Sequence, residues 1–105
     1  MRSLIVKITC GAEAPERCSQ GFTVAATAVA AGAEVSLWLT GDAAWFATPG
    51  PAEEFEVAAG TVTVCTQCAL RRDLGPDDLL PGVRIAGAAA YVEEVLADGA
   101  QALVY

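Results

Sequence analysis

The sequence predicts a single three-layer α/β domain over residues 1–105, built on a mostly parallel sheet of four to five strands. Short runs of β-branched and other apolar residues alternate along the chain with segments that show helical spacing. A chain of 105 residues has room for one hydrophobic core and not for two. Because parallel strands are joined through crossover helices, we expect helices on both faces of the sheet.

The first part of the chain fits a strand, a helix and a second strand. The first strand is expected over residues 4–8, and the helix over residues 15–31, with a proline in its first turn. The core-facing stripe of this helix should consist of Phe22, Ala25, Ala26 and Val29. The second strand is expected over residues 34–40, where the alternation places Trp38 on the less buried side.

The middle of the chain is less regular. Gly41-Asp42 offers a turn before a short helix over residues 43–47, in which Trp45 and Phe46 are interpreted as core or interface residues. A Pro-Gly-Pro sequence then ends that helix, and residues 52–60 fit no element well. The connection to the next strand is therefore short for a parallel crossover.

The remaining elements come in quick succession. In order, we expect a strand, a helical turn, a second helical turn, a short strand, a helix and a last strand over residues 61–64, 66–72, 76–80, 83–85, 87–98 and 101–105. The buried stripe of the C-terminal helix should be Ala88, Tyr91, Val92, Val95 and Leu96.

Composition narrows the possible functions. The net charge is −7, from 6 basic and 13 acidic residues, which argues against nucleic acid or an anionic membrane as a direct partner. The chain has no histidine, so a Cys–His dyad, a Ser–His–Asp triad and a His-ligated metal are all excluded. The first residues lack the apolar region of a signal peptide, and no segment approaches the length of a membrane span. We therefore expect a cytoplasmic protein, in which structural disulfides are rare.

The most informative stretch for chemistry is residues 61–72. Cys65 falls where the third strand ends and a helical turn begins, at the sheet edge where open α/β domains bind ligands. The thiolate is the reactive form of cysteine, and the amides at a helix start stabilise an anion. Arg71 and Arg72 add positive charge shortly afterwards. We therefore predict that Cys65 is the reactive residue, with the two arginines as electrostatic support.

Two further cysteines are candidates for a supporting role beside Cys65. Cys68 lies on the next turn and is a possible resolving thiol. Cys10 also stands at the carboxyl end of a strand. It would lie within reach of Cys65 if the first and third strands were neighbours, because adjacent strands are about 4.8 Å apart.

Three other interpretations of the cysteines remain open. Cys65 and Cys68 have the CxxC spacing of a thiol–disulfide redox module, although no proline lies between them. Alternatively, zinc or an iron–sulfur cluster would have four thiolate ligands in Cys10, Cys18, Cys65 and Cys68. The last alternative is an interaction subunit whose cysteines are merely packed.

The chain resembles the DsrE-like (DsrE/DsrF-like) sulfur-relay family, small α/β subunits that carry sulfur as a cysteine persulfide. The most specific match is Val64-Cys65-Thr-Gln-Cys-Ala-Leu-Arg-Arg72, which is similar to the family's strand-end cysteine followed by variable positions and Ala-Leu-Arg-Arg-Gly. Residues 5–11 and 22–39 extend the resemblance. It implies that Cys65 is the sulfur carrier of a sulfurtransferase-like protein without a cofactor. It also implies sulfur donor and acceptor proteins as partners, and assembly as a homotrimer or homohexamer.

Two positions depart from the family pattern. Asp73 stands where a glycine usually follows the two arginines. The region before Thr61 is shorter than expected, where a full helix would normally stand.

Overall fold

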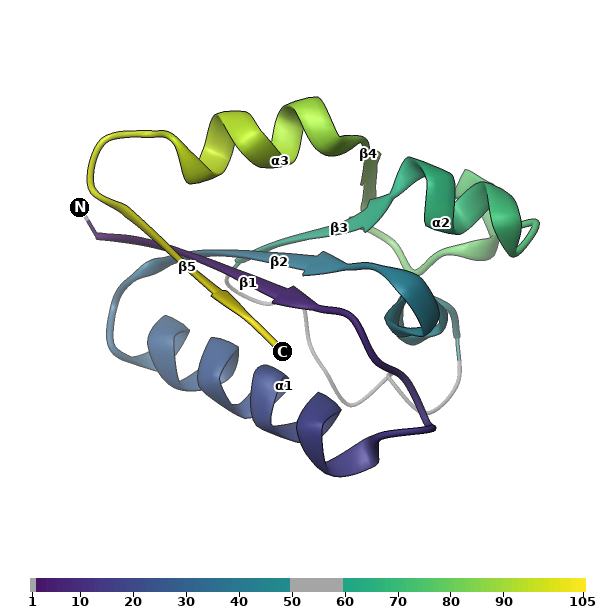
Figure 1. The fold of residues 1–105 in the computed structure, drawn as a ribbon, viewed down its shortest axis with the longest axis horizontal. Helices are drawn as coiled ribbons and strands as arrows, with labels where there is room; N and C mark the ends of the chain where they lie inside the picture. Colours follow the sequence, from purple (N-terminus) through teal and green to yellow (C-terminus); the bar gives the residue numbers. More distant parts are fainter. Residues whose placement is uncertain (1, 50–59) are drawn as a thin grey trace.

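The computed structural model describes residues 2–49 and 60–105, which fold into one sheet with helices on both sides (Figure 1). The strands are β1 (Ser3–Ile8), β2 (Glu34–Leu39), β3 (Gly60–Cys65), β4 (Arg84–Ala86) and β5 (Ala100–Val104). The helices are α1 (Pro15–Ala30), α2 (Thr66–Arg71) and α3 (Ala88–Val95), with two 3-10 helices, η1 (Gly41–Ala47) and η2 (Pro76–Asp78). Residues 52–59, which were expected to fit no element, lie outside the described residues. Among the helices of the described part, none has the length and apolar character needed to cross a membrane.

Every strand pair in the described sheet is parallel, and the strand order is β4-β3-β2-β1-β5. The predicted parallel sheet of four to five strands is therefore confirmed. Across the three central strands, Lys7 of β1 is aligned with Trp38 of β2, which is aligned with Thr63 of β3. Because β2 separates β1 from β3, the first and third strands are not neighbours.

The two long helices cover opposite faces of the sheet, α1 below it and α3 above it in Figure 1. Alternate residues of β1, β2 and β3 point toward α1 and form the main apolar core. Those buried strand residues are Val6, Ile8, Val35, Leu37, Leu39, Val62 and Val64. Burial of this surface is the principal source of stability that the described fold offers.

Helix α1 approaches the sheet closely because its contact face is made of small residues. Its buried positions are Cys18, Gly21 and Ala25. A Cβ atom at Gly21 would lie only 2.9 Å from Ile8 Cγ1, so the glycine allows the helix to sit directly on β1. The predicted stripe was right at Ala25 but wrong at Ala26, which is exposed because the buried face is turned toward Cys18 and Gly21.

The opposite face of the sheet mixes polar residues with two buried apolar ones, Ile5 and Trp38. Trp38 is 1% exposed, so the prediction that it lies on a less buried side was wrong. The Tyr91 ring of α3 covers it edge-to-face, with the ring centroids 5.2 Å apart. Ser36 Oγ and Trp38 Nε1 both donate hydrogen bonds to the Glu94 carboxylate, which also pairs with Arg84 at 2.8 Å. Helix α3 is therefore attached through one ring and one carboxylate.

The predicted buried stripe of α3 is right for Tyr91, which packs on Trp38, and wrong for Ala88, Val92 and Leu96, which are exposed. No residue within the helix is buried, Val92 is 49% exposed, and Leu96 at its end is 76% exposed. The physical reason is that the contacts of α3 with this face run through Tyr91, which packs on Trp38, and Glu94, which accepts hydrogen bonds from Ser36 and Trp38. Its remaining apolar side chains face outward, beside strand β5, in which four of the five residues are also exposed.

Candidate functional site

The candidate site lies at the carboxyl edge of the sheet, where β1, β2 and β3 end. Cys65 is the last residue of β3 and the N-cap residue of α2, the strand–helix junction that the sequence predicts. Val64 before it is fully buried in the core beneath the sheet. Because side chains alternate along a strand, Cys65 faces the side of the sheet that α3 covers. Its side chain is half-buried and so partly open to solvent.

The surroundings of Cys65 favour its thiolate. Partial burial raises the pKa of the thiol, but groups that prefer the anion outweigh this effect. In decreasing order, the groups that lower the pKa are the backbone amides of Cys68 and Gln67, the Cys68 thiol and the Lys7 ammonium. The amides approach the sulfur without completing a regular side-chain cap of α2. The net pKa lies below the usual value for cysteine, which increases the amount of nucleophile at neutral pH.

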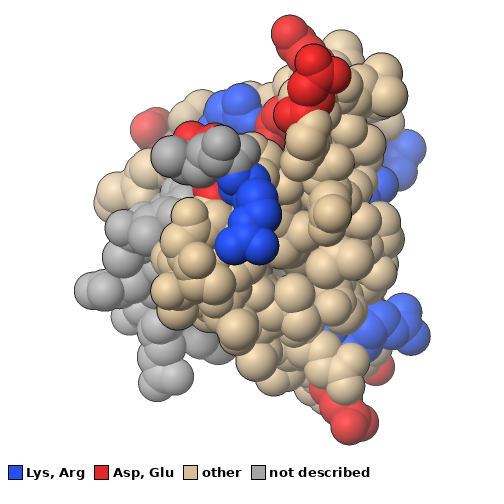
Figure 2. All heavy atoms as spheres, turned by 90° about the vertical axis from the view of Figure 1, so that its left-hand side faces the viewer, with Lys and Arg blue, Asp and Glu red and all other residues tan. Residues whose placement is uncertain are grey.

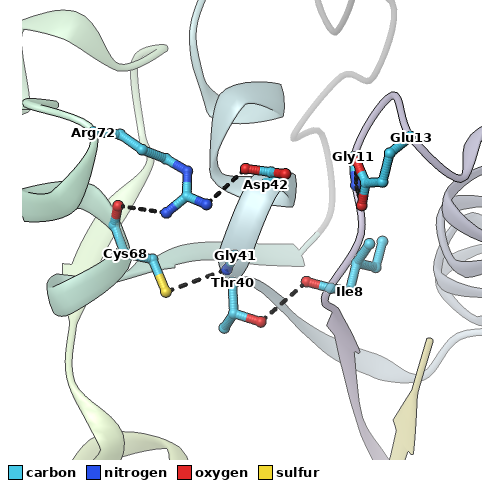
Figure 3. Close-up of polar contacts among 8 residues, drawn as sticks. All are labelled: Ile8, Gly11, Glu13, Thr40, Gly41, Asp42, Cys68 and Arg72. Carbon is cyan, nitrogen blue, oxygen red and sulfur yellow. Dashed lines mark hydrogen bonds and ion pairs between the residues drawn. The ribbon is translucent and has the colours of Figure 1, made fainter.

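Cys68 lies in α2 and faces the loop that follows β2. The amide of Gly41 donates a hydrogen bond to Cys68 Sγ at 3.2 Å (Figure 3). Gly41 has a φ of 56°, and a Cβ atom there would lie 2.9 Å from the carbonyl oxygen of Thr9, so this close approach requires glycine. The structure thus brings Cys68 and Cys65 to one edge of the sheet, both as free thiols.

Arg72 braces the loop around Cys68. Its guanidinium lies 2.6 Å from Asp42 Oδ1 and donates a hydrogen bond to the Cys68 carbonyl oxygen at 3.1 Å (Figure 3). This ion pair ties α2 to η1, the element that begins with Gly41. Arg72 therefore contacts Asp42 and the Cys68 backbone, and the electrostatic support of Cys65 that the sequence predicts from it stays a prediction. Arg71 is exposed at the end of α2.

A positive charge that acts on Cys65 comes from Lys7, a residue that sequence reasoning did not single out. The Lys7 ammonium lies over the Tyr91 ring, 5.1 Å from its centroid. Whereas burial raises the pKa of Cys65, the Lys7 charge lowers it. The sequence does indicate which face of the sheet Lys7 occupies, because side chains alternate along β1 and Lys7 therefore points away from the face of Val6 and Ile8. The sequence did not give the strand order, which is needed to relate Lys7 on β1 to Cys65 on β3.

Cys10 and Cys18 form a second cysteine pair, inside the core. Each is 3% exposed. Burial raises the pKa of Cys18 to about 11, and the nearby Cys10 thiol and Glu13 carboxylate add to this effect. The suggestion that Cys10 could serve Cys65 required β1 and β3 to be neighbours, and it is corrected by the strand order, in which β2 lies between them.

The alternative interpretation, a four-thiolate metal site, finds no support among the residues that the structure describes. Within residues 2–49 and 60–105, no group of three or more Cys, Asp or Glu side chains is placed to hold a metal ion. Cys10 and Cys18 are buried in the core, whereas Cys65 and Cys68 stand half-buried at the start of α2. The geometry therefore favours interpretations in which the two pairs act separately.

A model of the DsrE/DsrF-like family matches residues 2–104, nearly the whole chain. The chain belongs to the DsrE/DsrF-like family. Comparison with curated protein sequences finds no match. At the position where the resemblance leads us to expect a glycine after two arginines, Asp73 has a φ of 53°. Glycine favours this left-handed region and aspartate tolerates it, so the chain keeps the turn after α2 without the glycine.

Solved structures share this family fold. The ychN protein from E. coli superposes with a TM-score of 0.83 at 17% sequence identity, over 100% of both chains. A protein of unknown function, MTH1491 from Methanobacterium thermoautotrophicum, superposes with a TM-score of 0.82 at 12% identity, again over 100% of both chains. At these identities the likeness establishes the fold, a parallel α/β domain.

Proposed function

We propose that this DsrE/DsrF-like protein is a sulfur-relay protein that carries sulfane sulfur as a persulfide on Cys65. The observation that carries the proposal is the half-buried Cys65 thiol at the junction of β3 and α2, with a pKa below its usual value despite the opposing effect of burial. A carrier needs a thiol that is both ionised and reachable by a donor and an acceptor. The family is generally linked to sulfur relay, which supports the same chemistry.

Loading and delivery are two balanced exchanges. In loading, the Cys65 thiolate attacks the outer sulfur of a donor persulfide, R–S–SH. A sulfur–sulfur bond forms at Cys65 as the donor's bond breaks, and the donor leaves as the thiolate R–S⁻. In delivery, an acceptor thiolate attacks the outer sulfur on Cys65, and Cys65 leaves as its thiolate. We propose protein donors and acceptors in the cytoplasm, where thiols are kept reduced.

The test is site-resolved mass spectrometry after incubation with glutathione persulfide. We expect the unaltered protein to gain one sulfur atom on Cys65, and Cys65→Ser to gain none. The matched controls, Cys10→Ser and Cys18→Ser, should load as the unaltered protein does, since both thiols are buried. Circular dichroism checks that each variant folds. If Cys65→Ser still accepts one sulfur per chain, the assignment to Cys65 is wrong.

A dithiol redox function is the second candidate, favoured by the placement of Cys68 in the short helix α2, three residues after its N-cap residue Cys65. Within sulfur relay, the same pair gives Cys68 a resolving role. A Cys68 thiolate attacks the inner sulfur of the Cys65 persulfide, a disulfide forms between the two cysteines, and hydrosulfide leaves. Cys68→Ser should then lengthen the lifetime of the persulfide. An unchanged lifetime would remove Cys68 from the relay, and disulfide formation without any sulfur loading would favour the redox function.

We also propose that the chain assembles as a homotrimer or homohexamer. Figure 2 looks at the side where the chain passes from α3 to β5 and shows uncharged surface to the right of and below one basic side chain near the middle, with most other charged side chains toward the rim. Strand β5 is an edge strand. The exposed large apolar residues of α3, its C-terminal cap and β5 are Val92, Leu96, Leu103 and Val104. An open edge strand beside apolar surface favours association unless something covers it.

The aromatic residues that suggested an interface from the sequence divide in the structure. Trp38 is buried, whereas Trp45 is 50% exposed. Phe46 is half-buried and packs edge-to-face on Phe22, with centroids 5.4 Å apart. Analytical ultracentrifugation tests the assembly. A single monomeric species at micromolar concentration would overturn it.

A further inference from the structure

The face of the sheet beneath α3 holds a row of alternating cations and aromatic rings. The Lys7 ammonium lies 5.1 Å from the centroid of the Tyr91 ring. Tyr91 packs on Trp38, and the Arg84 guanidinium lies 5.6 Å from the centroid of the Trp38 ring. Cation–π contacts of this kind hold a flexible basic side chain in a defined place. The row therefore has a fixed cation at each end.

The two cations of the row differ in their partners. Arg84 is neutralised, because it pairs with Glu94 Oε2 at 2.8 Å and donates a hydrogen bond to Thr63 Oγ1 at 2.9 Å. Within the described part of the chain, Lys7 has no carboxylate within ion-pair distance. The charge of Lys7 is therefore available to act on another group nearby.

The strand register directs that charge toward the reactive cysteine. Lys7, Trp38 and Thr63 are aligned across β1, β2 and β3 on one face of the sheet. Cys65 lies two residues beyond Thr63, so alternation returns it to the same face. The titratable or charged side chains that strand alternation and the contacts of α3 put on this face are Glu34, Lys7, Cys65, Arg84, Tyr91 and Glu94, and Cys68 of α2 contacts Cys65 from beside it.

Lys7 adds a positive charge to the amides of Cys68 and Gln67 and the Cys68 thiol, which favour an anion at Cys65 more strongly, in a chain of net charge −7. The two arginines after Cys65 do not supply the charge directly, because Arg72 is paired with Asp42 and Arg71 is exposed. Burial raises the pKa of Cys65, and the Lys7 ammonium is among the groups that lower it. Both the geometry and the electrostatics thus connect β1 to the end of β3.

We propose that Lys7, held by the Tyr91 ring, is a positioning residue that stabilises the anionic sulfur of Cys65, first as the thiolate and then as the persulfide. The proposal rests on the sulfur-carrier function proposed above and adds a residue to it. The charge is the same in both anions, so one fixed ammonium favours both. Tyr91 acts through Lys7, by keeping the ammonium on this face of the sheet.

The experiment measures the alkylation rate of Cys65 by iodoacetamide against pH, with each cysteine followed by mass spectrometry in the full chain. Lys7→Met removes the charge and keeps an unbranched apolar side chain. We expect the midpoint of the Cys65 profile to move to higher pH, with a rate at neutral pH lower by about three- to tenfold. Lys7→Arg should restore a profile close to that of the unaltered protein.

A matched control separates this effect from a change in net charge. Arg17→Met removes one positive charge from an exposed position on α1, which covers the other face of the sheet. Its Cys65 profile should match that of the unaltered protein. An equal midpoint in Lys7→Met and Arg17→Met overturns the proposal.

A second variant covers the case in which Lys7→Met does not fold. Tyr91→Leu leaves the charge in place and removes the ring that holds it, so the midpoint should move in the same direction by a smaller amount. An unmoved midpoint in a folded Tyr91→Leu overturns the holding role of the ring. Alkylation needs no persulfide donor, so these results stand apart from sulfur loading. Failure of Cys65 to load would count against the relay function alone.

Discussion

The chain contains two pairs of cysteines with opposite properties. Cys65 and Cys68 stand half-buried at the start of α2, and Cys10 and Cys18 are buried in the core beside α1. Although both pairs raise the possibility of thiol chemistry in the sequence, only the first meets groups that favour an anion. Burial raises the pKa of the Cys65 thiol, yet amides, a thiol and an ammonium bring it below the usual value. Burial together with Cys10 and Glu13 raises the pKa of Cys18 to about 11.

The comparison of Cys65 with Cys18 indicates that the groups around a thiol decide whether its pKa is raised or lowered. Both Cys65 and Cys18 lose hydration, which penalises their thiolates. Cys65 recovers the loss because it occupies the N-cap position of α2, where the amides of Cys68 and Gln67 approach its sulfur, and because it shares a face with Lys7. Cys18 lies within the first turn of α1 beside a carboxylate, so its electrostatic partners add to the penalty. A cysteine in that setting packs as a small apolar residue.

The largest expected effect is a difference in alkylation rate. A pKa of about 11 leaves about one Cys18 thiol in ten thousand ionised at pH 7. We expect iodoacetamide to modify Cys65 at least about a hundredfold faster than Cys18 in the folded protein. The Cys65 rate should level off at a pH below the usual pKa of cysteine. In urea the four cysteines should react alike, and equal rates in the folded chain would contradict the comparison.

The next largest effect is on the unfolding free energy in alkaline solution, which Cys18 and Cys65 should change in opposite directions. The raised pKa of Cys18 contributes stability that is present below pH 9.0 and is lost as the pH rises toward about 11. The unfolding free energy of the unaltered protein relative to Cys18→Ala should fall by on the order of 2 kcal/mol across that range.

The contribution of Cys65 to the unfolding free energy should change with pH in the opposite direction. Its lowered pKa contributes stability that is present above the usual pKa of cysteine and is lost as the pH falls through the folded value. The unfolding free energy of the unaltered protein relative to Cys65→Ala, measured in urea at each pH, should therefore increase as the pH rises. Parallel trends for the two variants would show that the two thiols are not distinguished by the fold.

A smaller effect should follow from Gly11→Ala, where the residue after Cys10 lies against Asp42, the neighbour of the Gly41 that binds Cys68. A Cβ atom at Gly11 would lie 2.8 Å from the Asp42 carbonyl oxygen and 3.0 Å from Asp42 Cβ. Because a backbone atom yields only if the loop moves, we expect a loss of about 1–2 kcal/mol in urea unfolding. The movement should also disturb the Gly41 bond to Cys68 and change the alkylation rate of Cys68.

Gly32→Ala serves as the control for this substitution. Gly32 has a φ of 88°, and nothing lies within 4 Å of a Cβ atom built there. It should therefore destabilise the chain through backbone strain alone, with the rates of Cys65 and Cys68 unchanged. If Gly11→Ala changes stability but leaves both rates as they are in Gly32→Ala, the two regions are not coupled through Asp42.

The smallest expected effect is that of Asp42→Asn. It removes the ion pair with Arg72, in which Asp42 is 54% exposed, so the loss of stability should be below about 1 kcal/mol. The alkylation rate of Cys68 should nevertheless change, because Arg72 also binds the Cys68 carbonyl. Asp77→Asn, at an exposed position in η2, is the control. Equal Cys68 rates in the two variants would exclude a bracing role for the pair.

The sequence by itself determined the order of the elements and the place of Cys65. A β-branched run that ends at a cysteine, followed by helix-forming residues, is a local pattern, and local patterns survive folding. The resemblance of residues 64–72 to the family likewise rests on a short run of consecutive residues. The sequence also separated the faces of each strand, since alternation is a property of the strand alone.

Only the tertiary structure decided which residues meet. The strand order removed Cys10 from Cys65 and placed Lys7 on the same face as Cys65, although Lys7 and Cys65 are far apart in the chain. The packing of Tyr91 buried Trp38 and left the outer side of α3 exposed. The physical reason is that contacts between strands depend on pairing and register, which a period of two or 3.6 residues does not encode. The place of Cys65 at a strand end could therefore be predicted from the sequence, and the presence of Lys7 on the same face could not.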